Sequence, residues 1–133
     1  MKSKTWGGGA LFAAFVLCSA PADAQLMNVP LPSLGDDKEM LVVEVNLAPG
    51  QGSEPHRHNA HVFVYVLEGQ VVMQVEGDDP VTLSPGQMFY ETPDDIHVVS
   101  RNASDTEPAR FLVHILKTIG VPVTTPVGPN EPG

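Results

Sequence analysis

Histidine is concentrated in two places of this chain. His56, His58 and His61 fall within six consecutive residues, and His97 follows a Pro-Asp-Asp sequence further on. The chain has 5 histidines, so four of them lie in these two places. Imidazole is the commonest side-chain ligand for transition metals, and it also serves in acid–base chemistry. The spacing therefore predicts a metal site more strongly than it predicts any particular reaction.

The His56-x-His58 spacing suits metal binding if this segment is extended. Side chains two residues apart on a strand point to the same face, so both imidazoles can reach one point. His97, on a separate strand, could add a third ligand, and three protein ligands with open positions are typical of reactive metal sites. The predicted cofactor is one divalent transition metal ion, with Fe, Mn, Ni or Zn as the candidates.

Simpler interpretations exist for individual histidines. A single His-x-His beside Arg57 and Asn59 is also what an exposed polar loop contains. His114 alternates with Leu112 and Leu116, which indicates a packed or edge histidine rather than a ligand. The metal hypothesis therefore depends on the group of four histidines and not on one pair alone.

Short β-branched segments separated by turn residues make up most of the chain after residue 24. Glycine, proline and aspartate fall between these segments rather than within them, as in tight turns. No amphipathic helix and no internal repeat is predicted there. Many short strands with such turns are typical of a β-sandwich or barrel. The predicted strands are 40–47, 62–67, 70–76, 81–83, 87–91, 96–101 and 110–117.

The first 24 residues have the pattern of a secretory signal peptide. Lys2 and Lys4 precede an apolar run that is too short to span a membrane, and Ala22-Asp23-Ala24 is a small-x-small cleavage pattern. We expect cleavage after Ala24 and a periplasmic or secreted protein, with a retained N-terminal anchor as the alternative. The rest divides into an extended segment at 25–37, one domain at 38–117 and a loose, proline-rich tail at 118–133.

The charge of the expected mature chain excludes two classes of partner. Cleavage removes Lys2, Lys4 and Asp23 from 7 basic and 16 acidic residues, which leaves 5 and 15 and a net charge of −10. Nucleic acids and anionic membranes require basic surface, so neither is an expected partner. Cleavage also removes Cys18, the chain's one cysteine. Stability must then come from apolar burial, a metal or a second subunit rather than from a disulfide.

The first histidine segment resembles the first sequence motif of the cupin superfamily. That motif runs Gly, five residues, His-x-His, three or four residues, Glu, six residues, Gly. Gly50, His56, His58 and Gly69 stand at the matching positions. Val62 occupies the glutamate position, so the acidic residue of the motif is absent from its expected place.

The segment around His97 resembles the second cupin motif, which runs Gly, five residues, Pro-x-Gly, two residues, His, three residues, Asn. Gly86 and His97 match it in spacing, whereas Thr92 and Asp94 replace its Pro and second Gly, and Asn102 falls one place late. Both motifs occur in order within residues 38–117. The resemblance implies an all-β fold, a single-domain, type-2 cupin β-barrel (double-stranded β-helix or jelly roll) after the N-terminal signal segment.

The absent glutamate leaves three interpretations of the site. His61, one position earlier, replaces it and completes a four-histidine site, which is the preferred version. Alternatively, three histidines and water bind the metal, or the site has lost its metal. Strand alternation turns His61 away from the face of Val62, but a bulge at the Asn59-Ala60 corner can re-aim a side chain.

The resemblance implies a dioxygenase-like, metal-dependent cupin enzyme that acts on a small organic substrate. It identifies no catalytic residue beyond the ligands, because fold by itself does not give a reaction. A non-catalytic module that binds a small anion, a sugar or a metal is the alternative. A metal-free, epimerase-like cupin fits less well, because its histidines would not need to cluster. Small cupins commonly pair, and exposed strand edges predict a homodimer here.

Overall fold

A computed structural model describes residues 24–128, and this part of the chain is all-β apart from one 3-10 turn, η1 (Pro32–Leu34). The all-β prediction is confirmed. The strands, in chain order, are β1 (Ala24–Pro30), β2 (Lys38–Leu47), β3 (Gly52–Ser53), β4 (His56–Arg57), β5 (His61–Glu68), β6 (Val71–Val75), β7 (Val81–Leu83), β8 (Met88–Glu91), β9 (His97–Asn102), β10 (Ala109–Thr118) and β11 (Thr125–Pro126).

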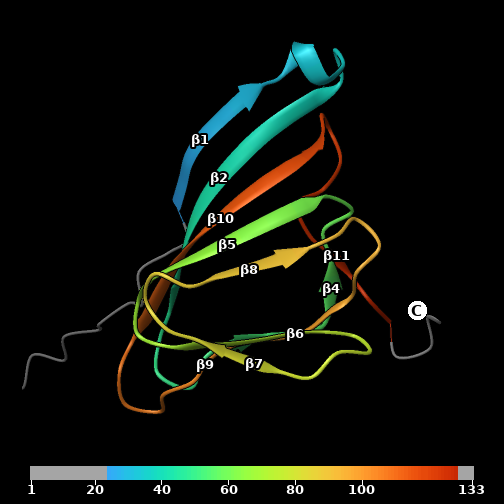
Figure 1. The fold of residues 1–133 in the computed structure, drawn as a ribbon. Helices are drawn as coiled ribbons and strands as arrows, with labels where there is room; N and C mark the ends of the chain where they lie inside the picture. Colours follow the sequence, from blue (N-terminus) through green and yellow to red (C-terminus); the bar gives the residue numbers. More distant parts are fainter. Residues whose placement is uncertain (1–23, 129–133) are drawn as a thin grey trace, which may run out of the picture.

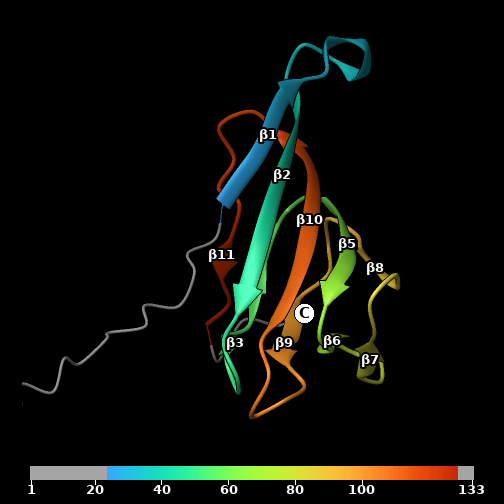
Figure 2. The ribbon, with the colours of Figure 1, turned by 90° about the vertical axis from the view of Figure 1, so that its left-hand side faces the viewer.

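These strands form two antiparallel sheets. The first has the strand order β1-β2-β10-β5-β8, and the second has the order β11-β4-β9-β6-β7 with β3 also paired to β9. Figure 1 shows the first sheet as a row of strands, with β6, β7 and β9 of the second sheet below it and β4 and β11 to its right. Figure 2, turned by 90°, shows β2 and β10 side by side. Strands distant in sequence pair in both sheets, which is the jelly-roll arrangement expected from the resemblance.

Side-chain alternation along the strands separates the core from the surface. On β5, Val62, Val64 and Val66 are buried, whereas the residues between them are exposed. Every second residue of β10, from Ala109 to Lys117, is buried as well. These two neighbouring strands therefore place one apolar face inside the barrel, as a period of two requires.

The predicted strands agree with the observed ones, and four further strands were not predicted. Each of the seven predicted strands is present, with ends that differ by at most two residues. The segment 25–37 was expected to be an extended lead-in, and the structure shows that β1 pairs with β2 from Ala24 to Pro30. A proline is compatible with this position, because β1 lies at the edge of its sheet and Pro30 ends it.

The tail is not loose as far as residue 128, which corrects the expectation drawn from its prolines. β11 pairs with β4, and Val123 packs against the core. Proline is tolerated in such a short edge strand, so the proline content of the tail did not imply that it is loose. The last residues, 129–133, and the expected signal peptide at 1–24, apart from Ala24, lie outside the described residues. Within the described part, no helix is long and apolar enough to cross a bilayer.

The Asn102 side chain links the end of β9 to two other segments. Its amide nitrogen donates to the carbonyl groups of Ala48, at 3.2 Å, and Glu107, at 2.7 Å, and its oxygen accepts from the backbone N–H of Ser104. It is only 1% exposed. These bonds satisfy a buried amide and hold the loop after β9 against the end of β2.

Gly69, which ends the first cupin motif, sits where no larger residue fits. Its φ is +70°, a conformation that side chains other than glycine rarely adopt. A Cβ atom there would lie 2.5 Å from the carbonyl oxygen of Pro108 and 2.9 Å from Cα of Ala109. The backbone of the turn from β5 to β6 therefore packs directly against the start of β10, with no side chain of residue 69 between them.

Replacing Gly69 with alanine should destabilise the fold more than replacing Gly77. Gly77 also has a positive φ, but no atom lies within 4 Å of its missing Cβ. Gly77→Ala should cost about 1–2 kcal/mol for the left-handed backbone alone. Gly69→Ala should add about 1–3 kcal/mol for the backbone clash. Urea denaturation of both variants measures this difference, and equal losses would contradict the steric explanation.

Candidate metal centre

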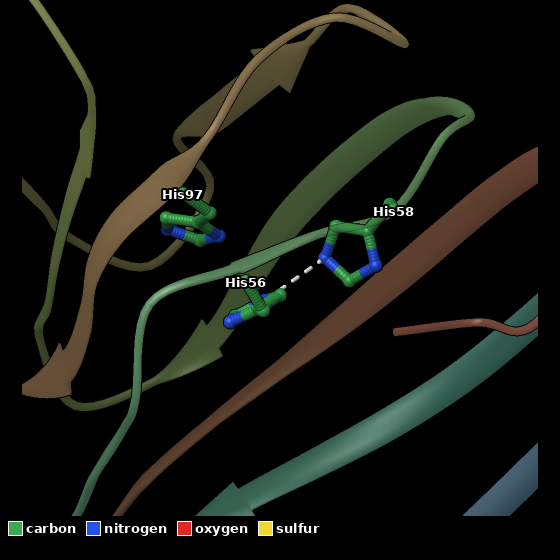
Figure 3. A group of neighbouring side chains, drawn as sticks. All are labelled: His56, His58 and His97. Atoms are coloured by element: carbon green, nitrogen blue, oxygen red, sulfur yellow. Dashed lines mark hydrogen bonds between the residues drawn. The ribbon is translucent and has the colours of Figure 1, made fainter. Parts of the chain in front are cut away.

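The structure brings three of the four predicted histidines together. His56 begins β4, His58 follows it directly, and His97 begins β9. The Cα atoms of His56 and His97 are paired across β4 and β9, and one ring nitrogen from each of the three histidines lies within 4.8 Å of the others. Figure 3 shows the three rings grouped around one small volume.

A short extended segment positions His56 and His58 on the same face. Pro55 precedes it, and Asn59 ends it with a φ of +50°, a left-handed turn that asparagine tolerates. Arg57, between the two histidines, points elsewhere, because its guanidinium donates to the carbonyl oxygen of Asp94 at 2.8 Å. The His-x-His spacing thus acts as predicted, with two imidazoles on one side.

Backbone carbonyl groups fix the tautomers of His56 and His58. Nδ1 of His56 donates to the carbonyl oxygen of Glu54 at 2.8 Å, and Nδ1 of His58 donates to that of Val123 at 2.6 Å. A carbonyl only accepts, so each Nδ1 carries the proton, and each neutral ring presents a bare lone pair on Nε2.

The two Nε2 atoms lie 3.2 Å apart, as the dashed line in Figure 3 marks. Two lone pairs at this distance repel unless a proton or a metal ion lies between or beside them. Imidazoles whose Nδ1–H is held by a carbonyl are the usual form of metal ligands. The local hydrogen bonds therefore fit a metal ion at the point where the rings converge.

Burial favours the neutral form that a metal ion requires. The pKa of His56 is lowered from the ordinary histidine value, mainly because burial penalises the charged ring, and the neighbouring His58 and His97 add to this effect. A ring that stays neutral keeps its lone pair available for a metal ion.

His97 is the most buried of the three histidines, with 4% of its surface exposed. Neither ring nitrogen has a hydrogen-bond partner among the described residues. The ring stacks near Phe89, with centroids 6.0 Å apart, and so its orientation is set by packing. An unpartnered buried polar group is costly, so His97 has the features of a ligand rather than of a structural histidine.

A buried carboxylate, Glu91, lies beside the histidines and was not predicted as a site residue. It ends β8 and is 2% exposed. Its Oε1 lies 3.1 Å from Nδ1 of His97, and its Oε2 lies 4.0 Å from Nε2 of His58. Alternation within Met88-Phe89-Tyr90-Glu91 was the available signal, because it places Glu91 on the same face as the half-buried Phe89.

The structure does not place His61 with the other three histidines. His61 begins β5 and is exposed, with its Nδ1 and the Tyr90 hydroxyl 2.7 Å apart on the outer face of the sheet. Val62 faces inward as strand alternation requires, and no bulge re-aims His61. The preferred four-histidine version is therefore not the observed arrangement. His114 also lies outside the group, with its Nδ1 3.4 Å from the Phe63 carbonyl oxygen.

His56, His58, His97 and Glu91 line a cavity of about 410 Å³. Its walls are mainly apolar and come from β2, β5, β6 and β10, together with Val123 of the tail. The exposed residues Gln51, Ser53 and Glu54 also line it, and they mark its rim. No lysine or arginine of the described chain lines this cavity. The arrangement offers nitrogen and carboxylate ligands inside a largely apolar cavity.

The fold and the site define an all-β barrel protein with a histidine-lined internal cavity. Residues 43–115 match the family model described as "Cupin domain". This match covers more than half of the chain, so the chain belongs to the cupin family, as its two motifs predicted. No curated protein matches this chain.

Solved structures of several different proteins resemble this one. The chain is similar to the DMSP lyase DddQ from Ruegeria pomeroyi DSS-3 (21% identity, TM-score 0.62) over 98% of its own length and 62% of the lyase chain. It resembles the polyketide cyclase RemF from Streptomyces resistomycificus (20%, 0.58) over 82% and 72%. It also resembles a salicylate 1,2-dioxygenase from Pseudaminobacter salicylatoxidans (28%, 0.52) over 57% and 21%. The fold is therefore shared by proteins named for different reactions.

Metal binding should depend on His58 and not on His61. Because Nε2 of His58 faces the other rings, His58→Ala should weaken Zn²⁺ binding by more than about 100-fold, beyond the usual effect of losing a supporting residue. His61→Ala, the matched control on the outer face, should bind as the wild type does. Metal content after loading and dialysis measures both variants, and loss of metal from His61→Ala would restore the four-histidine version.

Proposed function

We propose that this chain is an exported, metal-dependent cupin enzyme of the dioxygenase-like type that acts on a small organic substrate. The observation that carries the proposal is the convergence of two bare Nε2 atoms and the unpartnered His97 ring in the lining of a largely apolar cavity. Such convergence has little structural purpose, because unpaired buried polar groups reduce stability. The proposal of export depends on the sequence of residues 1–24 alone.

His56, His58 and His97 would hold one divalent transition metal ion, with Fe, Mn, Ni or Zn as candidates. Imidazole ligands suit these metals, and a set that leaves open positions is typical of reactive sites. Bound there, the ion would supply a Lewis acid for substrate oxygens and, if redox-active, a centre for reaction with O₂.

The cavity supports a substrate with an apolar body and one oxygen-bearing group. Phe111, Val113 and Ile115 form one wall and would contact the apolar part. No basic side chain of the described residues lines the cavity, and Glu54 at its rim would repel anions. A substrate with two negative charges would therefore find one positive group at most, the metal ion itself.

Similarity to the salicylate 1,2-dioxygenase, at 28% identity over 57% of this chain, supports oxygenase chemistry as a candidate type of reaction. This chain spans only 21% of that dioxygenase, so the comparison supports the type of reaction and not the substrate. Hydroxylated aromatic monoacids are the probes that agree with both the similarity and the apolar walls.

Wild-type protein loaded with Fe²⁺ should consume O₂ in the presence of a small hydroxylated aromatic acid such as salicylate. His97→Ala should lose uptake by more than about 100-fold, because it removes one nitrogen ligand. An oxygen electrode with a panel of such acids measures the rate, and His61→Ala serves as the control. Stoichiometric metal without turnover on any compound of the panel would favour a binding module. Absence of metal from the wild type would refute the metal-dependent enzyme.

We also propose that the protein is a homodimer that pairs through the outer face of β5 and β8. Phe63 and Tyr65 are each 38% exposed, and Met88 and Tyr90 are 58% and 47% exposed. Phe63 pairs with Tyr90 and Tyr65 with Met88 across the two strands, so the four side chains form one apolar patch. A patch of this kind at a sheet edge favours association.

Met88→Glu should shift the protein from dimer to monomer, because a charge at the centre of a buried contact would lose its hydration. Val81→Glu is the matched control, since Val81 is 40% exposed on β7 of the other sheet. Light scattering after size exclusion measures the mass of each variant. A monomeric wild type, or a dimer unaffected by Met88→Glu, would contradict this interface.

A further inference from the structure

We propose that Glu91 is the anionic ligand of the metal site, supplied by β8 in place of the glutamate that β5 lacks. This inference depends on the proposed metal site, and it concerns the one position at which the chain departs from the first cupin motif. A carboxylate would thus be restored to the site from a neighbouring strand.

The register between β5 and β8 supports this exchange. Val62, which stands at the glutamate position of the motif, is paired directly with Glu91 in the antiparallel ladder. Directly opposite residues lie on the same face of a sheet, with Cβ atoms about 4.5–5.5 Å apart. Both residues face the barrel interior, Val62 with 0% and Glu91 with 2% exposure. A side chain at position 91 can therefore reach into the same region as one at position 62.

The surroundings of Glu91 lack any other partner that would justify its burial. No lysine or arginine of the described chain forms an ion pair with it, and its nearest charged or chargeable groups are His97 and His58. Its Oε1 is buried without a hydrogen-bond partner. A buried carboxylate without a positive partner is strongly disfavoured, and a divalent metal ion among the three histidines would supply that charge.

The contacts of Glu91 agree less well with a role in which it only orients the His97 ring. Carboxylates that orient a ligand histidine accept a hydrogen bond from its ring N–H. Oε1 of Glu91 lies 3.1 Å from Nδ1 of His97, yet neither atom has a hydrogen-bond partner. The two groups are near each other without the geometry of that hydrogen bond. Both instead remain available to a third species between them.

Exchanging the two paired residues tests the proposal directly. The proteins are the wild type, Glu91→Val, the double variant Val62→Glu/Glu91→Val and the isosteric Glu91→Gln. Co²⁺ is the probe, since its visible spectrum reports the coordination and a competing chelator gives the affinity. The matched control is Glu76→Val, because Glu76 is an exposed glutamate after β6 that does not line the cavity.

Glu91→Val should weaken Co²⁺ binding by more than about 100-fold and change the spectrum, since losing a supporting residue costs about 10- to 100-fold. Glu91→Gln should also lose affinity, which guards against a folding defect in the valine variant. The double variant should recover binding to within about tenfold of the wild type, and Glu76→Val should bind unchanged. Recovery by a carboxylate on the other strand is not expected if Glu91 only orients His97.

Wild-type Co²⁺ affinity in both Glu91 variants would overturn the proposal while leaving the three-histidine site intact. A folded double variant, judged by its thermal unfolding, that binds no better than Glu91→Val would also overturn it. Failure of the wild type itself to bind Co²⁺ would instead refute the metal site and, with it, the role of Glu91.

Discussion

The site depends on two hydrogen bonds from histidine Nδ1 to backbone carbonyl groups. The Glu54 carbonyl holds His56 and the Val123 carbonyl holds His58, and these bonds leave both Nε2 lone pairs directed at one point. Since a carbonyl cannot donate, the tautomers are set by the backbone and not by solvent. A change in either carbonyl position would turn a ring and separate the nitrogens, so the histidine cluster is as rigid as the backbone around it.

This constraint gives the C-terminal segment a role in the site. Val123 supplies the carbonyl acceptor for His58 and also part of the cavity wall, and β11 is held to the site by pairing with β4. His58 is therefore connected to the C-terminal segment by one hydrogen bond, and β4 by strand pairing. The proline-rich segment after β10 is thus part of the candidate metal site, because its Val123 carbonyl accepts the hydrogen bond from His58.

The barrel also places polar groups where they are costly. His97 and Glu91 are buried with unpartnered polar atoms beside walls of valine, phenylalanine and isoleucine. The surrounding apolar core, with its alternating strands β5 and β10, offsets this cost. The same walls limit the charge that a substrate can carry, so the packing that stabilises the fold also selects what enters the cavity.

The sequence by itself determined the all-β class, the positions of the long strands and the pairing of His56 with His58 on one face. These features are local, because both signals, alternation with a period of two and the turn residues, depend only on residues that are close in sequence. It also predicted His97 as a possible third ligand, and the resemblance to a known motif supported that prediction. The short strands β3, β4 and β11 were missed, because two-residue pairings have no periodicity to detect.

Only the tertiary structure decided which groups complete the site. It separated His61 from the site, because β5 alternates regularly from His61 to Val66 and keeps Val62 inward. It brought in Glu91, because β8 pairs with β5 in a register that sets residue 91 opposite residue 62. Register and strand order arise from contacts between distant segments, so the spacing of residues within one strand could not reveal them.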